Sequence, residues 1–169
     1  MLDQFKMNTS KTVQQLQAQL VTPENFKCYG QMIFASIDGK HYDSEDAGLN
    51  WQNGIPRFYI MRLHHKGRKF HTITRHVKCT KCLGSLEGKD WLIAVAPAND
   101  DAEPKLEDIA AFRIPGNCFI KLELGTWHAG PYFDHEFVDF YNLELSDTNV
   151  VDHFTHNFIK SHQLEFDIV

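Results

Sequence analysis

Short apolar segments recur along the chain at intervals of roughly 8–12 residues, with glycine and proline between them. Strands are predicted at 32–37, 57–63, 70–76, 91–97, 119–124, 136–145 and 152–158, with one more around Trp127 and His128. The segment 91–97 is apolar throughout, which is typical of a strand buried on both faces. This spacing predicts a mainly β protein, a barrel or a sandwich.

Helices are expected only at the edge of such a fold. Val13, Leu16 and Leu20 stand at three- and four-residue steps, and Thr22-Pro23 resembles a helix N-cap followed by proline. Residues 1–30 are therefore predicted to form a helical extension packed on the β domain. The segment 104–112 begins with proline and predicts one further helix, whereas the polar, turn-rich segment 38–54 predicts a long loop.

Length and composition limit the class of protein. The 169 residues fit one domain, and 43% hydrophobic residues suffice for a packed core. The net charge is −5 and there is no long basic run, so neither nucleic acid nor an anionic membrane is an expected partner. No apolar run has the length of a signal peptide or a membrane span, so a cytoplasmic location with reduced cysteines is expected.

The first motif with possible chemistry is Cys79-Thr-Lys-Cys82, which His76 extends to H-x2-C-x2-C. A structural zinc site needs four ligands, and the chain has no second pair of this kind. A thioredoxin-type role would require a helix to begin after the motif, and the following LGSLEG does not start one. Two ordinary thiols and no tightly bound structural zinc are therefore predicted.

The second motif is GTWHAGP at 125–131, in which a glycine turn precedes Trp127 and His128. Neighbouring side chains of a strand point to opposite faces, so only one of the two can line the interior of a barrel. A histidine hydrogen-bonded to a backbone carbonyl is the structural alternative for His128. Histidines outside these motifs are interpreted as structural or surface residues, namely His135, His153, His156 and His162.

Several segments in fixed order resemble the ureidoglycolate lyase family. They are LVTPENFKCYGQMI, then TRHVKCTKCLGSLEGKDWLIAVAP, then AFRIPGNCFIKLELGTWHAGP and VDFYNLEL, together spanning roughly residues 20–145. The resemblance implies a cupin-like antiparallel β-barrel (a double-stranded β-helix) with a few peripheral helices, and a homodimer. It also implies a lyase that splits ureidoglycolate into glyoxylate and urea in purine catabolism, the pathway of allantoin degradation.

Carried over to this sequence, the resemblance implies a site in the barrel mouth that binds a small anionic substrate. Its catalytic residues would be His128 and His76, and its substrate-binding residues Arg75, Lys81, Trp127, Lys121 and Glu123. For Lys121 and Glu123 a solvated surface role is an equal alternative, because Ile120 and Leu122 form the apolar face of the same strand. No cofactor is expected; a divalent metal, if any, would use His76 and His128.

The sequence also departs from the family pattern. Thr74 stands in place of an acidic residue, Lys81 in place of a glutamine, and Glu144-Leu145 in place of an Asp-Arg pair. In the cupin metal pattern, Thr74 and Lys81 fill two of the four ligand positions, so that two imidazoles remain without a carboxylate. Two alternatives to the lyase stay open: a non-catalytic or differently specific cupin that binds a small anion, and a metal-dependent cupin enzyme.

Overall fold

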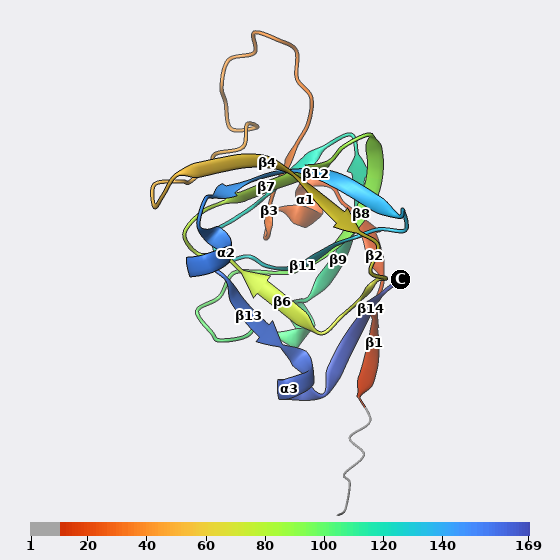
Figure 1. Cartoon of the computed structure of the whole chain (residues 1–169). Helices are drawn as coiled ribbons and strands as arrows, with labels where there is room; N and C mark the ends of the chain where they lie inside the picture. The colour runs from red at the N-terminus through yellow and green to blue at the C-terminus, as the bar shows by residue number, and fades with distance from the viewer. Residues whose placement is uncertain (1–10) are drawn as a thin grey trace, which may run out of the picture.

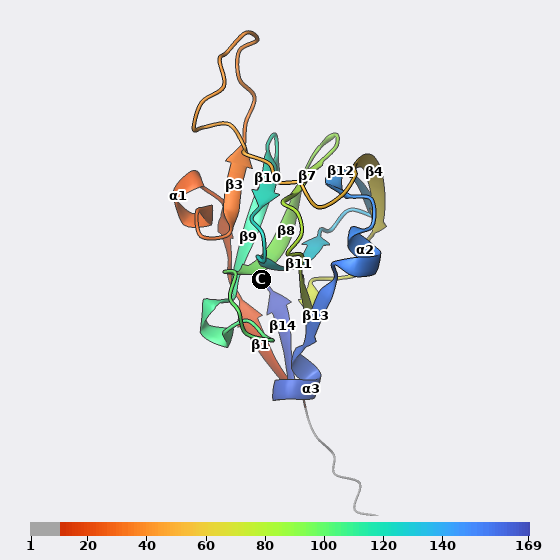
Figure 2. The same ribbon diagram turned by 90° about the vertical axis from the view of Figure 1, so that its left-hand side faces the viewer.

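The computed structural model describes residues 11–169, and these form a mainly β fold with few short helices (Figures 1 and 2). One sheet has the order β3 (Gly30–Ile33), β10 (Phe119–Leu122), β7 (Lys81–Ser85), β12 (Phe137–Leu145), β4 (Pro56–His64). A second has the order β13 (Phe154–Asn157), β6 (Thr72–Arg75), β11 (Trp127–Tyr132), β8 (Gly88–Ala96), β9 (Ala110–Gly116), β2 (Ala18–Leu20). The third contains β1 (Thr12–Leu16), β14 (Leu164–Ile168) and β5 (Lys69–Phe70).

Two hydrophobic cores lie on the two sides of the six-stranded sheet. The inner core joins it to the five-stranded sheet and includes Trp91, Ile93, Phe112, Ile120 and Phe140. The outer core joins it to the three-stranded sheet and includes Phe70, Ile73, Trp127, Phe158 and Phe166. Side chains of β8 alternate between the two cores, which confirms that this strand is buried on both faces. The mainly β, cupin-like fold is as predicted.

The N-terminal helix prediction is wrong for the described residues 12–20, which form β1 and β2; residues 1–10 lie outside the described part. The apparent helical stripe is not a buried face, because Val13 and Leu20 are exposed. Instead, β1 pairs parallel with β14 and β2 pairs parallel with β9, so each satisfies its backbone at a sheet edge. Only the short helix α1 (Pro23–Phe26) forms as expected, with a capping box between Thr22 and Asn25.

The helix predicted at 104–112 is also wrong. Only a three-residue 3₁₀ turn, η1 (Leu106–Asp108), forms before β9 begins. Ala111 and Phe112 pair with Ala94 and Ile93 of β8 and are buried, so tertiary packing overrides the weak local helix preference. Two further short helices, α2 (Thr148–Val151) and α3 (Phe158–His162), and the last strand β14 are additions to the expected elements.

The long loop predicted at 38–54 is confirmed: residues 34–55 contain no helix or strand and project from the top of Figure 1. The loop is fastened to the start of β7, where the Trp51 indole N–H donates to the Thr80 carbonyl at 3.2 Å. The Asn50 amide donates to the Thr80 hydroxyl at 2.9 Å. Within residues 11–169, no helix has the length and apolar character needed to cross a membrane.

Candidate active site

Three strands place polar side chains in the inner space between the two large sheets. Thr74 of β6 lies opposite His128 of β11, and His128 lies opposite Val95, a residue of the inner core. Residues in register share a face, so His128 faces inward. His76 faces inward as well, since its ring centroid lies 5.1 Å from that of His128. The pairing of these two residues that the sequence predicted is therefore present.

A glycine turn holds the two histidine segments together. The Gly125 amide donates to the His76 carbonyl at 2.7 Å, directly before the strand that carries His128. Gly125 has a φ of 77°, a conformation that side-chain-bearing residues rarely adopt. The turn therefore fixes the backbones of the two histidines relative to each other.

The tautomer of His76 is set by its surroundings. Its Nδ1 contacts the carbonyl of Asp152, which can only accept, so Nδ1 carries the hydrogen and Nε2 is left with a lone pair. The Asp152 carboxylate accepts from the amides of Val77 and Lys78, both at 2.8 Å, which anchors that carbonyl. Burial, followed by the charge of Lys81, lowers the pKa of His76, so the ring is neutral near pH 7.

His128 lies in a similar environment. Its Nδ1 is 3.4 Å from the Thr126 carbonyl. Burial, with Lys81 and His76 as further causes, lowers the pKa of His128 well below its ordinary value. A third ring, that of His153, lies 5.6 Å from His76, and His153 is exposed, in keeping with its interpretation as a structural or surface residue. The cluster therefore offers two neutral imidazoles, those of His76 and His128, as proton acceptors, and the His153 ring lies at its rim.

Lys81 is the cation beside these rings, and its partner is Glu144 at 3.0 Å. Glu144 is fully buried and also accepts from the Tyr59 hydroxyl at 3.1 Å. Burial alone would raise the pKa of Glu144, but the charge of Lys81 and hydrogen bonds outweigh it and lower the pKa. Glu144 was not among the predicted site residues; the only signal in the sequence was its departure from the family pattern.

Arg75 and Trp127 lie on the other side of the six-stranded sheet. The Arg75 guanidinium sits 4.4 Å from the Trp127 ring centre and donates to the Asn99 carbonyl at 2.6 Å. The Trp127 indole N–H donates to the Asn99 side-chain oxygen at 3.0 Å. These two predicted substrate-binding residues are thus brought together with each other and separated from the two histidines by the sheet.

Lys121 and Glu123 are also separated from the cluster. Ile120 and Leu122, which alternate with them, belong to the inner core, so Lys121 lies on the outer face of the five-stranded sheet. There it forms an ion pair with Glu123 and donates to the Gly48 carbonyl of the long loop at 3.2 Å. Of the seven predicted residues, the structure therefore brings three, His76, Lys81 and His128, to one inner site.

The inner residues do not fit the divalent metal of the cupin pattern. Lys81 holds the position of the acidic ligand, and its ammonium would repel a cation. The Thr74 hydroxyl, in the first ligand position, is hydrogen-bonded to Thr155 at 2.9 Å. The cysteine motif offers no better site, because burial raises the pKa of the Cys82 thiol to about 12 and keeps it protonated.

A mainly β fold with two neutral imidazoles and one paired ammonium clustered between its two large sheets defines a cupin-like protein with a buried polar cluster. The comparison with family models gives the family: the ureidoglycolate lyase model matches residues 37–160, and the chain belongs to this family. No curated protein matches the chain. The matched stretch contains His76, Lys81, His128, Glu144 and His153.

Proposed function

We propose that the chain cleaves the C–N bond of ureidoglycolate and releases glyoxylate and urea, as a step of purine catabolism. A neutral imidazole takes the proton of the substrate hydroxyl, the oxygen forms the carbonyl of glyoxylate, and the C–N bond breaks toward nitrogen. The resulting imidazolium returns the proton to the departing urea nitrogen, so no cofactor is consumed. Membership of the family supports this reaction.

One observation carries the assignment of roles: His76 and His128 lie side by side, both neutral, with each Nδ1 directed to a backbone carbonyl. Each ring therefore presents Nε2 as a base. We assign the proton transfer to His76, because its pKa is lowered less and a base works best near the operating pH. His128 presents a second neutral Nε2 beside His76, which can accept a hydrogen bond from the substrate.

Lys81 is proposed to bind the substrate carboxylate. An ammonium has three donors, so the ion pair with Glu144 leaves donors for a second carboxylate. Glu144 acts here as a positioning residue, which holds the Lys81 side chain in place within the buried network of Tyr59 and Asn142. Arg75, Trp127, Lys121 and Glu123 have no direct part in this site.

The test is turnover of ureidoglycolate by the full chain, with urea and glyoxylate both measured. Wild-type protein should form the two products in equal amounts, and His76→Ala and His128→Ala should lose most of kcat. The matched control is His135→Ala, which removes an exposed histidine elsewhere. The paired change Cys79→Ser with Cys82→Ser should also leave activity intact. Absence of turnover by the folded wild-type chain would refute the lyase assignment.

A second candidate function is binding or conversion of a different small anion, and the Lys81–Glu144 pair favours it. A carboxylate already held by the ammonium weakens the attraction for a substrate carboxylate. Calorimetry with ureidoglycolate, glyoxylate and other small carboxylates distinguishes the two. Tight binding of another anion without ureidoglycolate turnover would favour this second function.

The chain is further proposed to act as a single cytoplasmic domain over residues 1–169 and to form a homodimer. Its four cysteines are free thiols, which supports a reducing compartment.

The edge strand β4 supports the proposed homodimer. In the described part, β4 pairs only with β12, so one backbone edge is open for pairing with a second chain, and Phe58 and Ile60 on this strand are exposed. Light scattering at micromolar concentration should give the mass of a dimer, and a monomer would contradict this.

A further inference from the structure

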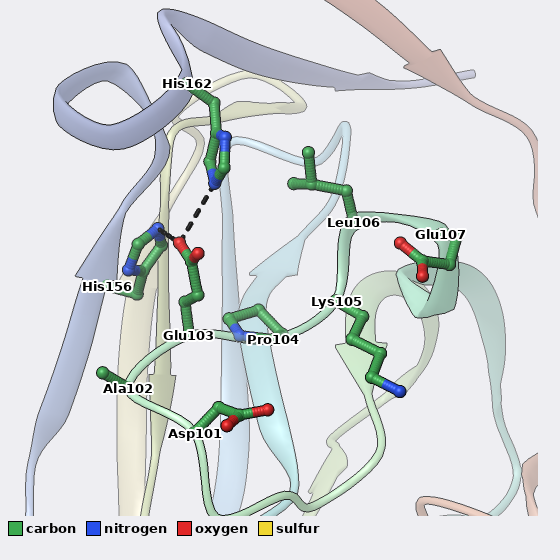
Figure 3. A pocket seen from close by; sticks show the side chains of 9 residues that line it. All are labelled: Asp101, Ala102, Glu103, Pro104, Lys105, Leu106, Glu107, His156 and His162. Atoms are coloured by element: carbon green, nitrogen blue, oxygen red, sulfur yellow. Dashed lines mark hydrogen bonds and ion pairs between the residues drawn. The ribbon is translucent and has the colours of Figure 1, made fainter.

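A second cluster of imidazole and carboxylate groups lines a surface pocket of about 530 Å³ on the outer side of the six-stranded sheet. Its members are Glu103, from the loop between β8 and η1, His156 of β13, and His162 at the end of α3 (Figure 3). His156 lies in register with Ile73, a residue of the outer core. The cluster is therefore on the opposite side of the sheet from His76 and His128.

The three side chains converge on one point. His156 Nε2 and His162 Nε2 lie 3.1 and 3.0 Å from the same oxygen, Oε2 of Glu103. Figure 3 shows both rings directed at this carboxylate from two different segments. All three potential ligand atoms lie within 4.8 Å of one another, and within residues 11–169 this is the one group of three or more such donors that converges.

Each donor is held by contacts of its own segment. The Glu103 carbonyl accepts from the Asn99 side-chain amide at 2.9 Å. The His156 ring packs edge-on against buried Phe158, with ring centres 4.9 Å apart. The helix that carries His162 is capped by Asn157, whose side chain accepts from the Lys160 amide. The arrangement therefore does not depend on the contacts among the three donors alone.

Two imidazole nitrogens and one carboxylate oxygen are a donor set suited to zinc and neighbouring divalent transition metals. Tetrahedral zinc, with bonds of about 2.0–2.1 Å, places its donors roughly 3.3 Å apart. The distances of 3.0 and 3.1 Å between the imidazole nitrogens and the carboxylate oxygen are close to this. The two imidazole nitrogens lie within 4.8 Å of each other, and His156 Nε2 also contacts the Ser161 hydroxyl at 2.8 Å. Binding a cation between the three donors would therefore draw the rings together and release the Ser161 contact.

We propose that Glu103, His156 and His162 bind a divalent transition-metal ion of the zinc class. The ion would tie the loop at 97–105 to the C-terminal segment of the chain. Three protein donors leave a fourth position for water or a small ligand, unlike a closed structural site, which has four protein donors. The site is independent of the lyase chemistry and gives a role to His156 and His162, which lie outside the sequence motifs at 76–82 and 125–131.

The experiment uses the full chain without an affinity tag, after removal of metal with a chelator. Zinc binding is measured by calorimetry, and cobalt(II) absorption reports the ligand type and coordination number. The donor variants are His162→Ala and Glu103→Gln. Their matched controls are His135→Ala, an exposed histidine elsewhere, and Asp101→Asn, an exposed carboxylate on the rim of the same pocket.

Wild type and both controls should bind one equivalent of zinc and melt at a higher temperature with it, because an ion that binds only the folded chain stabilises it. Each donor variant should weaken zinc binding at least tenfold and lose the thermal shift. The cobalt spectrum should lack thiolate charge-transfer bands. The proposal is overturned if wild type binds no zinc, if the donor variants bind it unchanged, or if cobalt shows thiolate ligation. Loss of binding in His128→Ala instead would place the ion at the inner cluster.

Discussion

The two faces of the six-stranded sheet contrast sharply around β6 and β11. On the inner face, His76 and His128 are neutral because burial and the Lys81 charge disfavour a further positive charge. On the outer face, the Arg75 guanidinium lies 4.4 Å from the centre of the Trp127 ring. Neighbours in sequence thus end in opposite surroundings, because side chains alternate along a strand. The contrast teaches that the two residues of a motif such as Arg75-His76 or Trp127-His128 lie on opposite faces of the sheet, so only the histidine of each pair reaches the inner site.

The largest effect should come from the inner imidazoles. His76→Ala and His128→Ala should each lower kcat about 10²–10⁴-fold, the usual contribution of a general base. Their thermal stability should stay within about 1–2 kcal/mol of wild type. Steady-state kinetics and a melting curve for each variant check this. If both variants are as active as wild type, the inner histidines do not take part in the reaction.

The next effect concerns the buried ion pair. Lys81→Met should lower the free energy of unfolding by about 3–5 kcal/mol, because it leaves Glu144 buried without its counter-charge. The double variant Lys81→Met with Glu144→Leu should recover most of this loss while remaining inactive. Urea denaturation measures both. If the double variant is no more stable than the single one, the Glu144 carboxylate does not need Lys81, and its hydrogen bond from the Tyr59 hydroxyl is sufficient.

Acid should act on the inner face through its histidines. Their folded-state pKa values are lowered below the unfolded value of about 6.5, so below that pH the unfolded chain binds more protons. Stability should therefore be constant above pH 6.5 and fall below it, by at most about 1.4 kcal/mol per pH unit for each histidine. Denaturation curves from pH 8 to 5 (roughly the window in which histidine titrates) test this, and His128→Ala should flatten the slope.

The smallest effect is expected on the outer face. Arg75→Lys keeps the charge but loses the planar contact with Trp127, which should cost about 1 kcal/mol of stability. Turnover should not change, since Arg75 does not reach the inner site. A loss of kcat comparable to that of His128→Ala would show that the outer face of the sheet contributes to turnover.

Much of the fold could be predicted from the sequence, because strand spacing and the doubly apolar segment 91–97 are local signals. The errors at 12–20 and 104–112 arose where strands form through distant partners, β14 and β8, which no local pattern reveals. Of the site, His76 and His128 could be found from their motifs. Glu144 could not be found in this way, because its role depends on the ion pair with Lys81, which lies on the neighbouring strand β7 but far away in the sequence.

The pairing of β1 with β14, seen side by side in Figure 2, also affects how the chain folds during its synthesis. Residues 12–16 leave the ribosome before their partners at 164–168, which emerge only after residues 17–163 have been made. The outer core, which includes Leu16 and Phe166, therefore stays incomplete until then, while the inner core already has its strands. Such distant pairing is slow to form, so the nascent chain exposes the apolar outer side of its six-stranded sheet during translation.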